Sequence, residues 1–275
     1  MKLMVIGGGG REHAIIKKLK ENPTVEVIYC LPGNGGIAAD AVCVPEIGAK
    51  DIPAQVEFAK AHRIDYAVVA PDDPLALGAV DALSEAGVPC FGPDKKAAVI
   101  EASKAFSKDL MKKYGIPTAK YRTFDSASEA VAYIETQNAF PTVVKADGLA
   151  LGKGVVIARD LAEAKDAVRS IMEDKLFGAS GNRIVVEEFL TGPEVSVLSF
   201  CDGETVAPMI SSMDHKRAFD GDEGPNTGGM GTVAPNACYT PEIAAECMER
   251  IFKPTLAAMR AEGCPFSGCL YFGLM

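Results

Sequence analysis

The sequence predicts an α/β protein in which an open parallel sheet is followed by an α+β domain, and three observations support this prediction. Short apolar runs alternate with helical periods over residues 1–91, as in parallel sheets with covering helices. A helical stretch over 95–114 then leads out of the first part. After residue 120, two apolar runs flank a glycine-rich loop, which is typical of an antiparallel hairpin.

Composition excludes several classes of protein. The chain has 275 residues, enough for two domains, and a net charge of -9 with no basic block, so we expect no nucleic-acid or membrane partner. The eight cysteines form no CxxC pair, and three histidines are too few for a histidine-rich metal site. There is no transmembrane-length apolar run and no signal peptide pattern. We therefore expect a cytoplasmic protein with reduced thiols and no obligate protein partner.

Two glycine turns follow the first two strands. Lys2–Ile6 is expected to be a buried strand, followed by Gly7–Gly10 and a helix to about Lys20. A second strand over Val25–Leu31 precedes Gly33-Asn34-Gly35-Gly36. Both turns would lie at the carboxyl edge of the sheet, where ligands of such sheets gather, and the free N–H groups of the helix with Arg11 favour an anion there.

The dinucleotide fingerprint is incomplete at this edge. Glu12 stands where the last glycine belongs, and no acid near Cys30 is placed to hold a ribose hydroxyl. An NAD-dependent dehydrogenase is therefore a distant alternative.

The alternation continues with helices over 52–62 and 75–86 and strands over 66–70 and 89–91. Asp72 and Asp73, after the strand over 66–70, would contact a ligand or cap the helix that begins at Leu75. The stretch 95–114 is expected to be one long helix. Taken alone, Lys104 in it would be a solvated lysine.

The segment Val143–Ala158 carries the strongest chemical signal. Its loop holds Gly148, Gly152 and Gly154, and Lys145 and Lys153 add positive charge. Glycines let backbone N–H groups approach an anion closely, so the segment suits a nucleotide triphosphate. The glycine spacing fails the P-loop pattern, and a strand follows the loop instead of a helix. An ordinary glycine-rich hairpin is the simpler alternative.

Two further segments are expected to line a polar site. The strand Arg183–Phe189 ends in Glu187 and Glu188, and Glu194 follows beyond a Gly-Pro turn. Residues 214–231 form a long, polar, glycine-rich stretch, which is usually functional or disordered. It does not fit a calcium loop, since position twelve is Gly231. After it, an amphipathic helix interrupted at Pro254 and a final strand from Pro265 are expected.

Six motifs occur in the order of a known family. They are GGGGREHA, PGNGG, SKAFSKDLM, VVKADGLALGKGVVIA, EEFLTGPEVSV and DHKR with GPNTGGMG. Together they resemble the phosphoribosylamine–glycine ligase (glycinamide ribonucleotide synthetase) family of the ATP-grasp superfamily, over the whole chain. The last motif is highly specific, whereas the lysine hairpin and EEFL are shared across ATP-grasp ligases.

The resemblance implies a fold and a reaction. It implies an N-terminal Rossmann-like (pre-ATP-grasp) domain over 1–103 and an ATP-grasp domain over 104–275, with a lid subdomain at about 119–193. ATP, glycine and 5-phosphoribosylamine would give glycinamide ribonucleotide, ADP and phosphate through a glycyl phosphate, in de novo purine biosynthesis. Such transfer needs neutralisation of phosphate charge and not a protein nucleophile. Mg²⁺ or Mn²⁺ would accompany ATP.

The resemblance also implies roles for individual residues. Those expected to hold ATP are Lys104, Lys145, Gly148, Gly152, Lys153, Gly154, Glu187, Glu188, Leu190 and Glu194. Those expected to hold glycine and phosphoribosylamine are Gly9, Gly10, Arg11, Glu12, Gly33, Asn34, His215, Pro225, Asn226, Thr227, Gly228 and Gly229. Those expected to act in catalysis are Lys145, Asp214, Lys216 and Arg217.

The chain departs from the family pattern at its end. Family members continue past a segment like Tyr271–Met275 to a Glu and an Asn that bind magnesium. Hence no metal ligand is expected up to Met275, and the chain is expected to be a fragment of the enzyme that binds nucleotide weakly and is inactive alone. Two alternatives remain open: another ATP-grasp carboxylate–amine ligase, and a non-catalytic nucleotide-binding protein.

Overall fold

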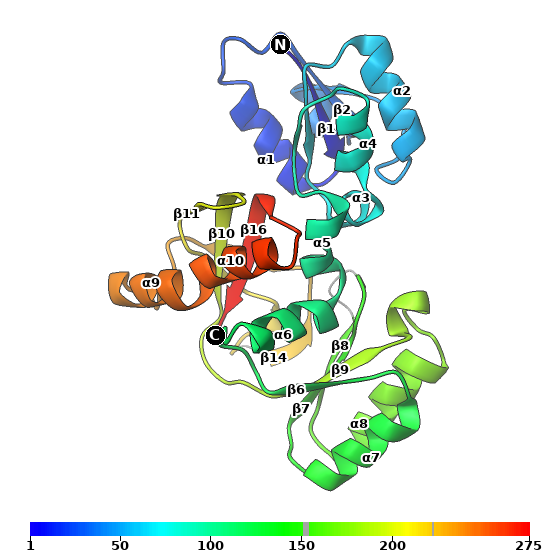
Figure 1. Ribbon diagram of the computed structural model, residues 1–275, viewed down its shortest axis with the longest axis vertical. Coiled ribbons are helices and arrows are strands. Elements are labelled where there is room, and N and C mark those ends of the chain that lie inside the picture. The colour runs from blue at the N-terminus through cyan, green and yellow to red at the C-terminus, as the bar shows by residue number, and fades with distance from the viewer. Residues whose placement is uncertain (151–153, 222) are drawn as a thin grey trace. The chain divides into compact units, whose positions relative to one another are not determined.

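The computed structural model describes residues 1–150, 154–221 and 223–275. The chain divides into two compact units, one of residues 1–99 with 266–268, and the other of residues 100–265 with 269–275. The ribbon in Figure 1 follows the elements of both units from blue to red.

The first unit is built on a parallel sheet of order β3-β2-β1-β4-β5. Its strands are β1 (Lys2–Gly7), β2 (Val27–Pro32), β3 (Val42–Cys43), β4 (Tyr66–Val69) and β5 (Cys90–Phe91). Its helices are α1 (Gly10–Leu19), η1 (Ile37–Ala39), α2 (Ile52–His62), α3 (Asp72–Leu77), α4 (Ala79–Glu85) and α5 (Lys95–Ala102). Helix α5 runs across the unit boundary.

The first strand shows why this sheet forms. Every residue of β1 from Leu3 to Gly7 is buried, because a parallel sheet is covered on both faces and its strands are continuously apolar. Met4 and Ile6 join a core cluster on one side, and Leu3 and Val5 join another. The expected open parallel sheet is confirmed.

The second unit contains an antiparallel sheet of order β6-β9-β7-β8. Its elements are α6 (Lys104–Lys113), β6 (Tyr121–Phe124), α7 (Ala127–Gln137), β7 (Thr142–Ala146), β8 (Val155–Ala158), α8 (Leu161–Val168), the π-helical turn η2 (Arg169–Glu173), η3 (Gly178–Gly181) and β9 (Ile184–Glu188). Figure 1 shows α7 and α8 side by side along this sheet, where their apolar residues share one core with β7 and β9.

The rest of the second unit carries another sheet, of order β11-β10-β16, and two short ladders. Its elements are β10 (Val195–Asp202), β11 (Val206–Pro208), β12 (Met213–Asp214), β13 (Arg217–Phe219), β14 (Glu223–Asn226), β15 (Thr232–Val233), α9 (Pro241–Cys247), η4 (Met248–Phe252), α10 (Lys253–Ala261) and β16 (Ser267–Leu274), which runs across the unit boundary. Alternate residues of β10 are buried, as expected of a sheet with one covered face. Phe252 stacks on Phe272 with ring centroids 4.1 Å apart.

Four expectations about helices and loops were wrong. The helix expected over 95–114 breaks at Ser103, which caps α6 by accepting the N–H of Phe106. The helix expected over 75–86 breaks at Gly78, whose positive φ of 94° ends α3. In the helical run 241–261, Pro254 lies in the first turn of α10, after the π-helical turn η4, and does not break it. The fourth error was the single loop expected over 214–231, since the ladders β12–β15 and β13–β14 occupy that region.

The capping role expected for Asp72 or Asp73 was also wrong. Helix α3 begins at Asp72 itself, the preceding Pro71 is the N-cap, and no side-chain cap bond forms. Both carboxylates instead lie in the first turn, where their negative charge interacts favourably with the positive end of the helix dipole. Asp73 also pairs with Lys50 at 2.5 Å.

Candidate functional site

The two glycine turns of the first unit meet at the carboxyl edge of its sheet. Gly33 donates its N–H to the Gly7 carbonyl at 3.1 Å, and Asn34 Nδ2 donates to the Gly8 carbonyl at 2.8 Å. A Cβ atom on Gly8 would lie 2.7 Å from the Gly33 carbonyl oxygen, so glycine is required for this approach. Asn34 Oδ1 accepts from the N–H groups of Gly36 and Ile37, which fixes the second turn. The structure therefore brings these predicted substrate residues together.

The start of α1 already faces a carboxylate of the chain. Glu12 is 5% exposed and makes one half of a capping box, because its Oε2 accepts the N–H of the N-cap residue Gly9, which has no side chain to return the bond. Part of the donor set expected for an external anion is thus used internally. Arg11 is exposed, and its Nη1 lies 3.3 Å from the Ala70 carbonyl oxygen, to which it donates, and 3.9 Å from Asp72 Oδ1.

The lysine hairpin has the predicted form. Strands β7 and β8 pair antiparallel with Lys145 opposite Val155, and Ala146 donates its N–H to the Gly154 carbonyl at 2.8 Å. Gly148 packs so closely that a Cβ atom would lie 2.6 Å from Ser180 Oγ. Gly152 and Lys153 lie outside the described residues.

Lys104 reaches this hairpin from the start of α6. Its backbone N–H donates to the Asp147 carbonyl at 3.0 Å, and its Nζ donates to the Gly148 carbonyl at 3.0 Å. Burial lowers the pKa of Lys104, the nearby carboxylates of Glu101 and Asp147 oppose that shift, and the charge of Lys145 adds to it. The structure therefore gathers two predicted phosphate-binding lysines and Gly148 around one hairpin.

Glu187 lies beside these lysines and is 5% exposed. The sheet order places β9 next to β7, so that Glu187 and Lys145 extend from the same side of neighbouring strands. Glu187 Oε2 accepts from Lys145 Nζ at 2.9 Å and lies 3.1 Å from Lys108 Nζ. Its other oxygen, Oε1, has no hydrogen-bond partner among the described residues.

Sequence reasoning missed Lys108 and Asp147. Lys108 is 9% exposed, although it belongs to a charged stretch that a periodicity argument assigns to solvent. Its position four residues after Lys104, on the same helical face, was the available signal. Asp147 immediately follows the hairpin strand β7, and its carboxylate accepts from the Ser103 hydroxyl at 3.0 Å.

The last residue of β9, Glu188, and the segment after it are more exposed. Glu188 accepts the N–H of Lys120 at 2.8 Å, and the Leu190 side chain is 43% exposed. Glu194 accepts a hydrogen bond from Lys216 Nζ at 2.6 Å. Burial acts to lower the pKa of Lys216, but the hydrogen bond and negative charge of Glu194 outweigh it, and the pKa is raised.

The glycine-rich segment 213–233 folds back on itself. The Lys216 carbonyl accepts both the N–H and the hydroxyl of Thr227, at 2.7 and 2.9 Å, and the His215 carbonyl accepts the N–H of Met230 at 2.7 Å. Arg217 Nη1 donates to the Gly224 carbonyl at 2.7 Å.

Glycine is required in this segment at position 229. A Cβ atom on Gly229, whose φ is +114°, would lie 2.7 Å from Asp214 Oδ1. Pro225 and Gly228 belong to the same folded segment, and the side chain of Asn226 lies outside the described residues. Predicted catalytic and substrate residues therefore lie in one segment that is held together by its own hydrogen bonds.

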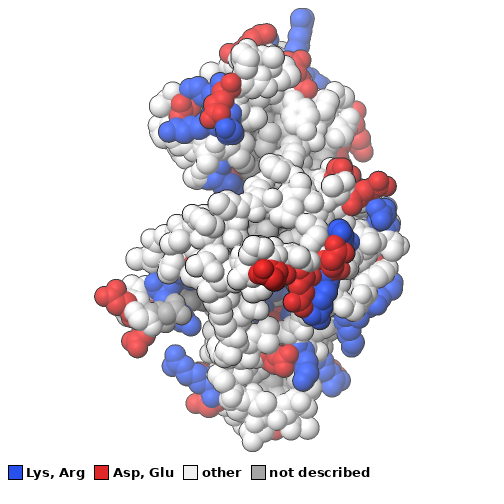
Figure 2. Space-filling view, turned by 90° about the vertical axis from the view of Figure 1, so that its left-hand side faces the viewer, with Lys and Arg blue, Asp and Glu red and all other residues white. Residues whose placement is uncertain are grey.

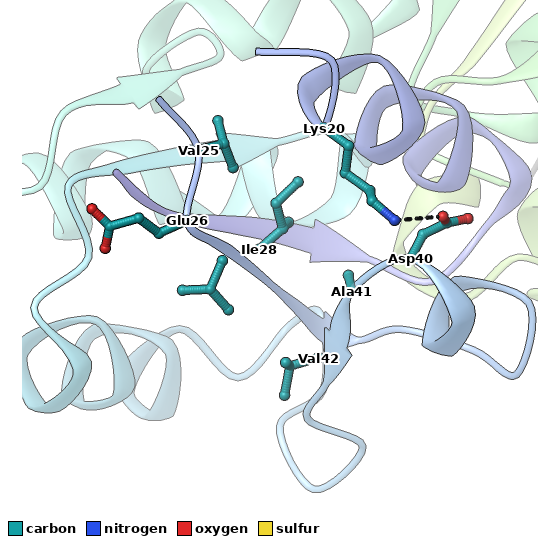
Figure 3. A pocket seen from close by; sticks show the side chains of 8 residues that line it. Lys20, Val25, Glu26, Ile28, Asp40, Ala41 and Val42 are labelled. Carbon is teal, nitrogen blue, oxygen red and sulfur yellow. Dashed lines mark hydrogen bonds and ion pairs between the residues drawn. The ribbon is translucent and has the colours of Figure 1, made fainter. Parts of the chain in front are cut away.

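Charge and cavities elsewhere add little to these sites. Basic and acidic side chains are interspersed on the face drawn in Figure 2. A pocket of about 360 Å³ lies near the amino ends of β2 and β3, away from the glycine turns, and its Lys20 and Asp40 pair with each other at 2.8 Å (Figure 3). We assign it no role, because the candidate sites are formed by the glycine turns and the lysine hairpin.

The part of the chain that the structure describes offers neither a metal-binding group nor a membrane-spanning helix. Across residues 1–150, 154–221 and 223–275, no three His, Cys, Asp or Glu side chains form a group able to hold a metal ion. Among those same residues, no helix combines the length and apolarity needed to cross a membrane.

Family models identify both parts of the chain. The model described as "Phosphoribosylglycinamide synthetase, N domain" matches residues 1–101, and that described as "Phosphoribosylglycinamide synthetase, ATP-grasp (A) domain" matches residues 102–275. The chain belongs to the phosphoribosylglycinamide synthetase family. The resemblance seen in the motifs is thereby confirmed.

Relatives agree with this membership. A phosphoribosylamine–glycine ligase from Allochromatium vinosum is 49% identical over the whole chain, and one from Brucella melitensis is 51% identical. The chain spans 64% of the length of each. The crystal structure of the phosphoribosylamine–glycine ligase from Thermotoga maritima is 32% identical with a TM-score of 0.83, and the chain covers 65% of it.

More distant structures share the fold alone. The biotin carboxylase domain of a 2-oxoglutarate carboxylase from Hydrogenobacter thermophilus, solved with MgADP, is 17% identical with a TM-score of 0.75. The fold class expected from the sequence, an open parallel sheet followed by an ATP-grasp domain, is thus confirmed for this family member.

Proposed function

We propose that this chain carries the nucleotide and amine sites of a phosphoribosylamine–glycine ligase, which joins glycine to 5-phosphoribosylamine at the expense of ATP in cytoplasmic purine synthesis. The observation that carries the proposal is the meeting of Lys104 and Lys145 at one glycine hairpin, in a member of the phosphoribosylglycinamide synthetase family. The chain spans 64% of the length of the relative from Allochromatium vinosum.

The proposed reaction has two steps. A glycine carboxylate oxygen attacks the γ-phosphorus, and the bond from that phosphorus to the ADP oxygen breaks, giving glycyl phosphate. The amine nitrogen then attacks the glycyl carbonyl carbon, the carbon–oxygen bond to phosphate breaks, and the amine loses a proton. Neither step needs a protein nucleophile. The chain's contribution is positive charge and fixed donors around the phosphates.

The proposed nucleotide site is formed by the second unit. Lys104, Lys145 and the hairpin from Gly148 to Gly154 would receive the phosphates. Glu187 Oε1 is buried and has no hydrogen-bond partner among the described residues, which supports the binding of a donor group of the adenine ring there. Glu188 and Leu190 would lie beside the adenine. Glu194 would meet the ribose hydroxyls. The domain limits proposed are 1–103 and 104–275, with the lid at about 119–193.

The proposed substrate residues fall into two groups. Gly9, Gly10, Arg11, Glu12, Gly33 and Asn34 belong to the sheet edge of the first unit, and Asp214, His215, Lys216, Arg217 and Pro225–Gly229 belong to the folded segment of the second. ATP implies Mg²⁺ or Mn²⁺, which would neutralise phosphate charge. The described residues offer no acidic cluster for such an ion, and we assign no residue to it.

The test is ADP release in the presence of Mg²⁺, with glycine and freshly made phosphoribosylamine each omitted in turn. It is run on this chain and on the chain extended by any sequence that follows Met275. ADP release that requires both substrates, in either form, is the expected result. If both forms release none, or release ADP equally well with other amino acids in place of glycine, the proposed function is wrong.

A further inference from the structure

One buried carboxylate serves two lysines in the second unit. Glu187 Oε2 is 2.9 Å from Lys145 Nζ and 3.1 Å from Lys108 Nζ. A buried carboxylate needs one close positive charge, because desolvation without a partner is strongly unfavourable. With two lysines present, one of them is in excess of what Glu187 requires.

The two lysines are held differently. Lys108 has an 11% exposed side chain, donates a second hydrogen bond to Thr118 Oγ1 at 2.8 Å, and lies over the Tyr121 ring at 5.8 Å from its centroid. Lys145 has a 26% exposed side chain, and its hydrogen bond goes to Glu187. Lys108 is therefore anchored, whereas Lys145 is the partner that can turn away.

We infer that Lys108 is a positioning residue, the permanent counter-ion of Glu187, which leaves Lys145 available to the phosphates of a bound nucleotide. If Lys108 were neutral, Glu187 would retain Lys145 as its sole counter-ion, and a phosphate would have to compete with a buried carboxylate for it. Burial lowers the pKa of Lys108, while the charge and hydrogen bond of Glu187 oppose that shift. This inference rests on the proposed nucleotide binding.

The test compares ADP with adenosine, which lacks phosphates, by calorimetric titration. Lys108→Met and Lys108→Gln should each weaken ADP binding about tenfold, the scale of one charge-assisted hydrogen bond, and change adenosine binding less than about twofold. Lys108→Arg keeps the charge and should retain most of the ADP affinity. The double variant Lys108→Met with Glu187→Gln should restore the ratio of ADP to adenosine affinity, because Lys145 is released again.

Lys112→Met is the matched control. Lys112 lies one turn further along α6, over the same Tyr121 ring at 5.9 Å, and no ion pair to a carboxylate is found for it among the described residues. Its loss should leave both affinities within about twofold of wild type.

Two results would overturn the inference. One is an equal loss of ADP and adenosine affinity in Lys108→Gln, which marks a purely structural role. The other is no loss at all. Lys108→Gln keeps hydrogen-bonding groups at this position, so the test does not depend on the folding of Lys108→Met. If wild type binds neither ligand, the proposed nucleotide site is wrong instead.

Discussion

The Ser103 hydroxyl donates a hydrogen bond to Asp147 Oδ1 at 3.0 Å, across 44 positions of sequence. The same carboxylate oxygen accepts the N–H of Ala105 at 2.7 Å. Ser103 Oγ in turn accepts the N–H of Phe106, which makes it the N-cap of α6. The first turn of α6, with Lys104, is thus fastened to the end of the hairpin strand β7.

Replacing Asp147 should loosen this connection. Asp147→Ala removes the acceptor of the Ser103 hydroxyl and of the Ala105 N–H, which leaves a helix N–H unpaired, and we expect a loss of about 1–3 kcal/mol in the free energy of unfolding. ADP affinity should fall as well, because the first turn of α6 keeps only the bonds of Lys104 to the Asp147 and Gly148 backbone carbonyls and is held less firmly at the hairpin. Urea unfolding and ADP titration measure the two effects.

The control for Asp147→Ala is Ser126→Ala, which removes the N-cap of α7. It should destabilise by about 1 kcal/mol and leave ADP affinity unchanged. Unchanged ADP affinity in Asp147→Ala would show that the connection has no part in nucleotide binding.

Replacing Lys145 should affect binding more than stability. Lys145→Met leaves Glu187 paired with Lys108, so the free energy of unfolding should change by less than about 1 kcal/mol, compared with about 3–5 kcal/mol for breaking an isolated buried pair. ADP affinity should fall about tenfold or more. Thermal unfolding and ADP titration check this. A large loss of stability would identify Lys145 as the principal partner of Glu187.

Glu194→Gln should lower the pKa of Lys216. Burial opposes the charged lysine, and the hydrogen bond and charge of Glu194 raise its pKa above the ordinary value. The pairing therefore stabilises the folded state at pH values below the ordinary lysine pKa, and this stabilisation is lost as the pH rises through the raised pKa of Lys216. Because both side chains are more than a third exposed, the gain is small.

An NMR titration of the lysine side chains measures this shift. Glu135→Gln removes the carboxylate 2.6 Å from Lys165 and serves as the control, since it should leave the Lys216 titration unchanged. A Lys216 pKa that is identical in wild type and Glu194→Gln would contradict the assignment.

Gly8→Ala should destabilise the first unit. The added Cβ would meet the Gly33 carbonyl oxygen at 2.7 Å, and the two turns must separate, at a cost of about 1–3 kcal/mol. Gly10→Ala is the matched control two positions away, with no atom within 4 Å of its Cβ. It should be neutral or raise stability by up to about 1 kcal/mol. Equal urea midpoints for the two variants would refute this.

Strong local patterns made much of the fold predictable. The buried apolar run of β1 and the glycines that follow it predict a parallel strand and a turn, because both consequences are local. The hairpin over 143–158 was predictable because two β-branched runs flank the loop. The break at Ser103 was less visible, since apolar spacing continues across it and only the cap bond reveals the new start.

The site was predictable in composition but not in its connections. Lys145 and Glu187 meet because the sheet order places β9 beside β7, and this order depends on packing between residues 42 positions apart in sequence. Lys108 has the chemistry of a surface lysine until that order is known. The ladders within 213–233 were missed because their strands are too short and too polar to show alternation.

The segment 213–233 is hydrogen-bonded to itself, with Thr227 bonded to Lys216 and Met230 to His215. A single open loop of this length would lose conformational freedom on binding, and that loss would weaken every contact it makes. Here the ordering is completed when the chain folds. His215 and Lys216 are thus preorganised, and the free energy of substrate binding is not reduced by the cost of ordering this segment.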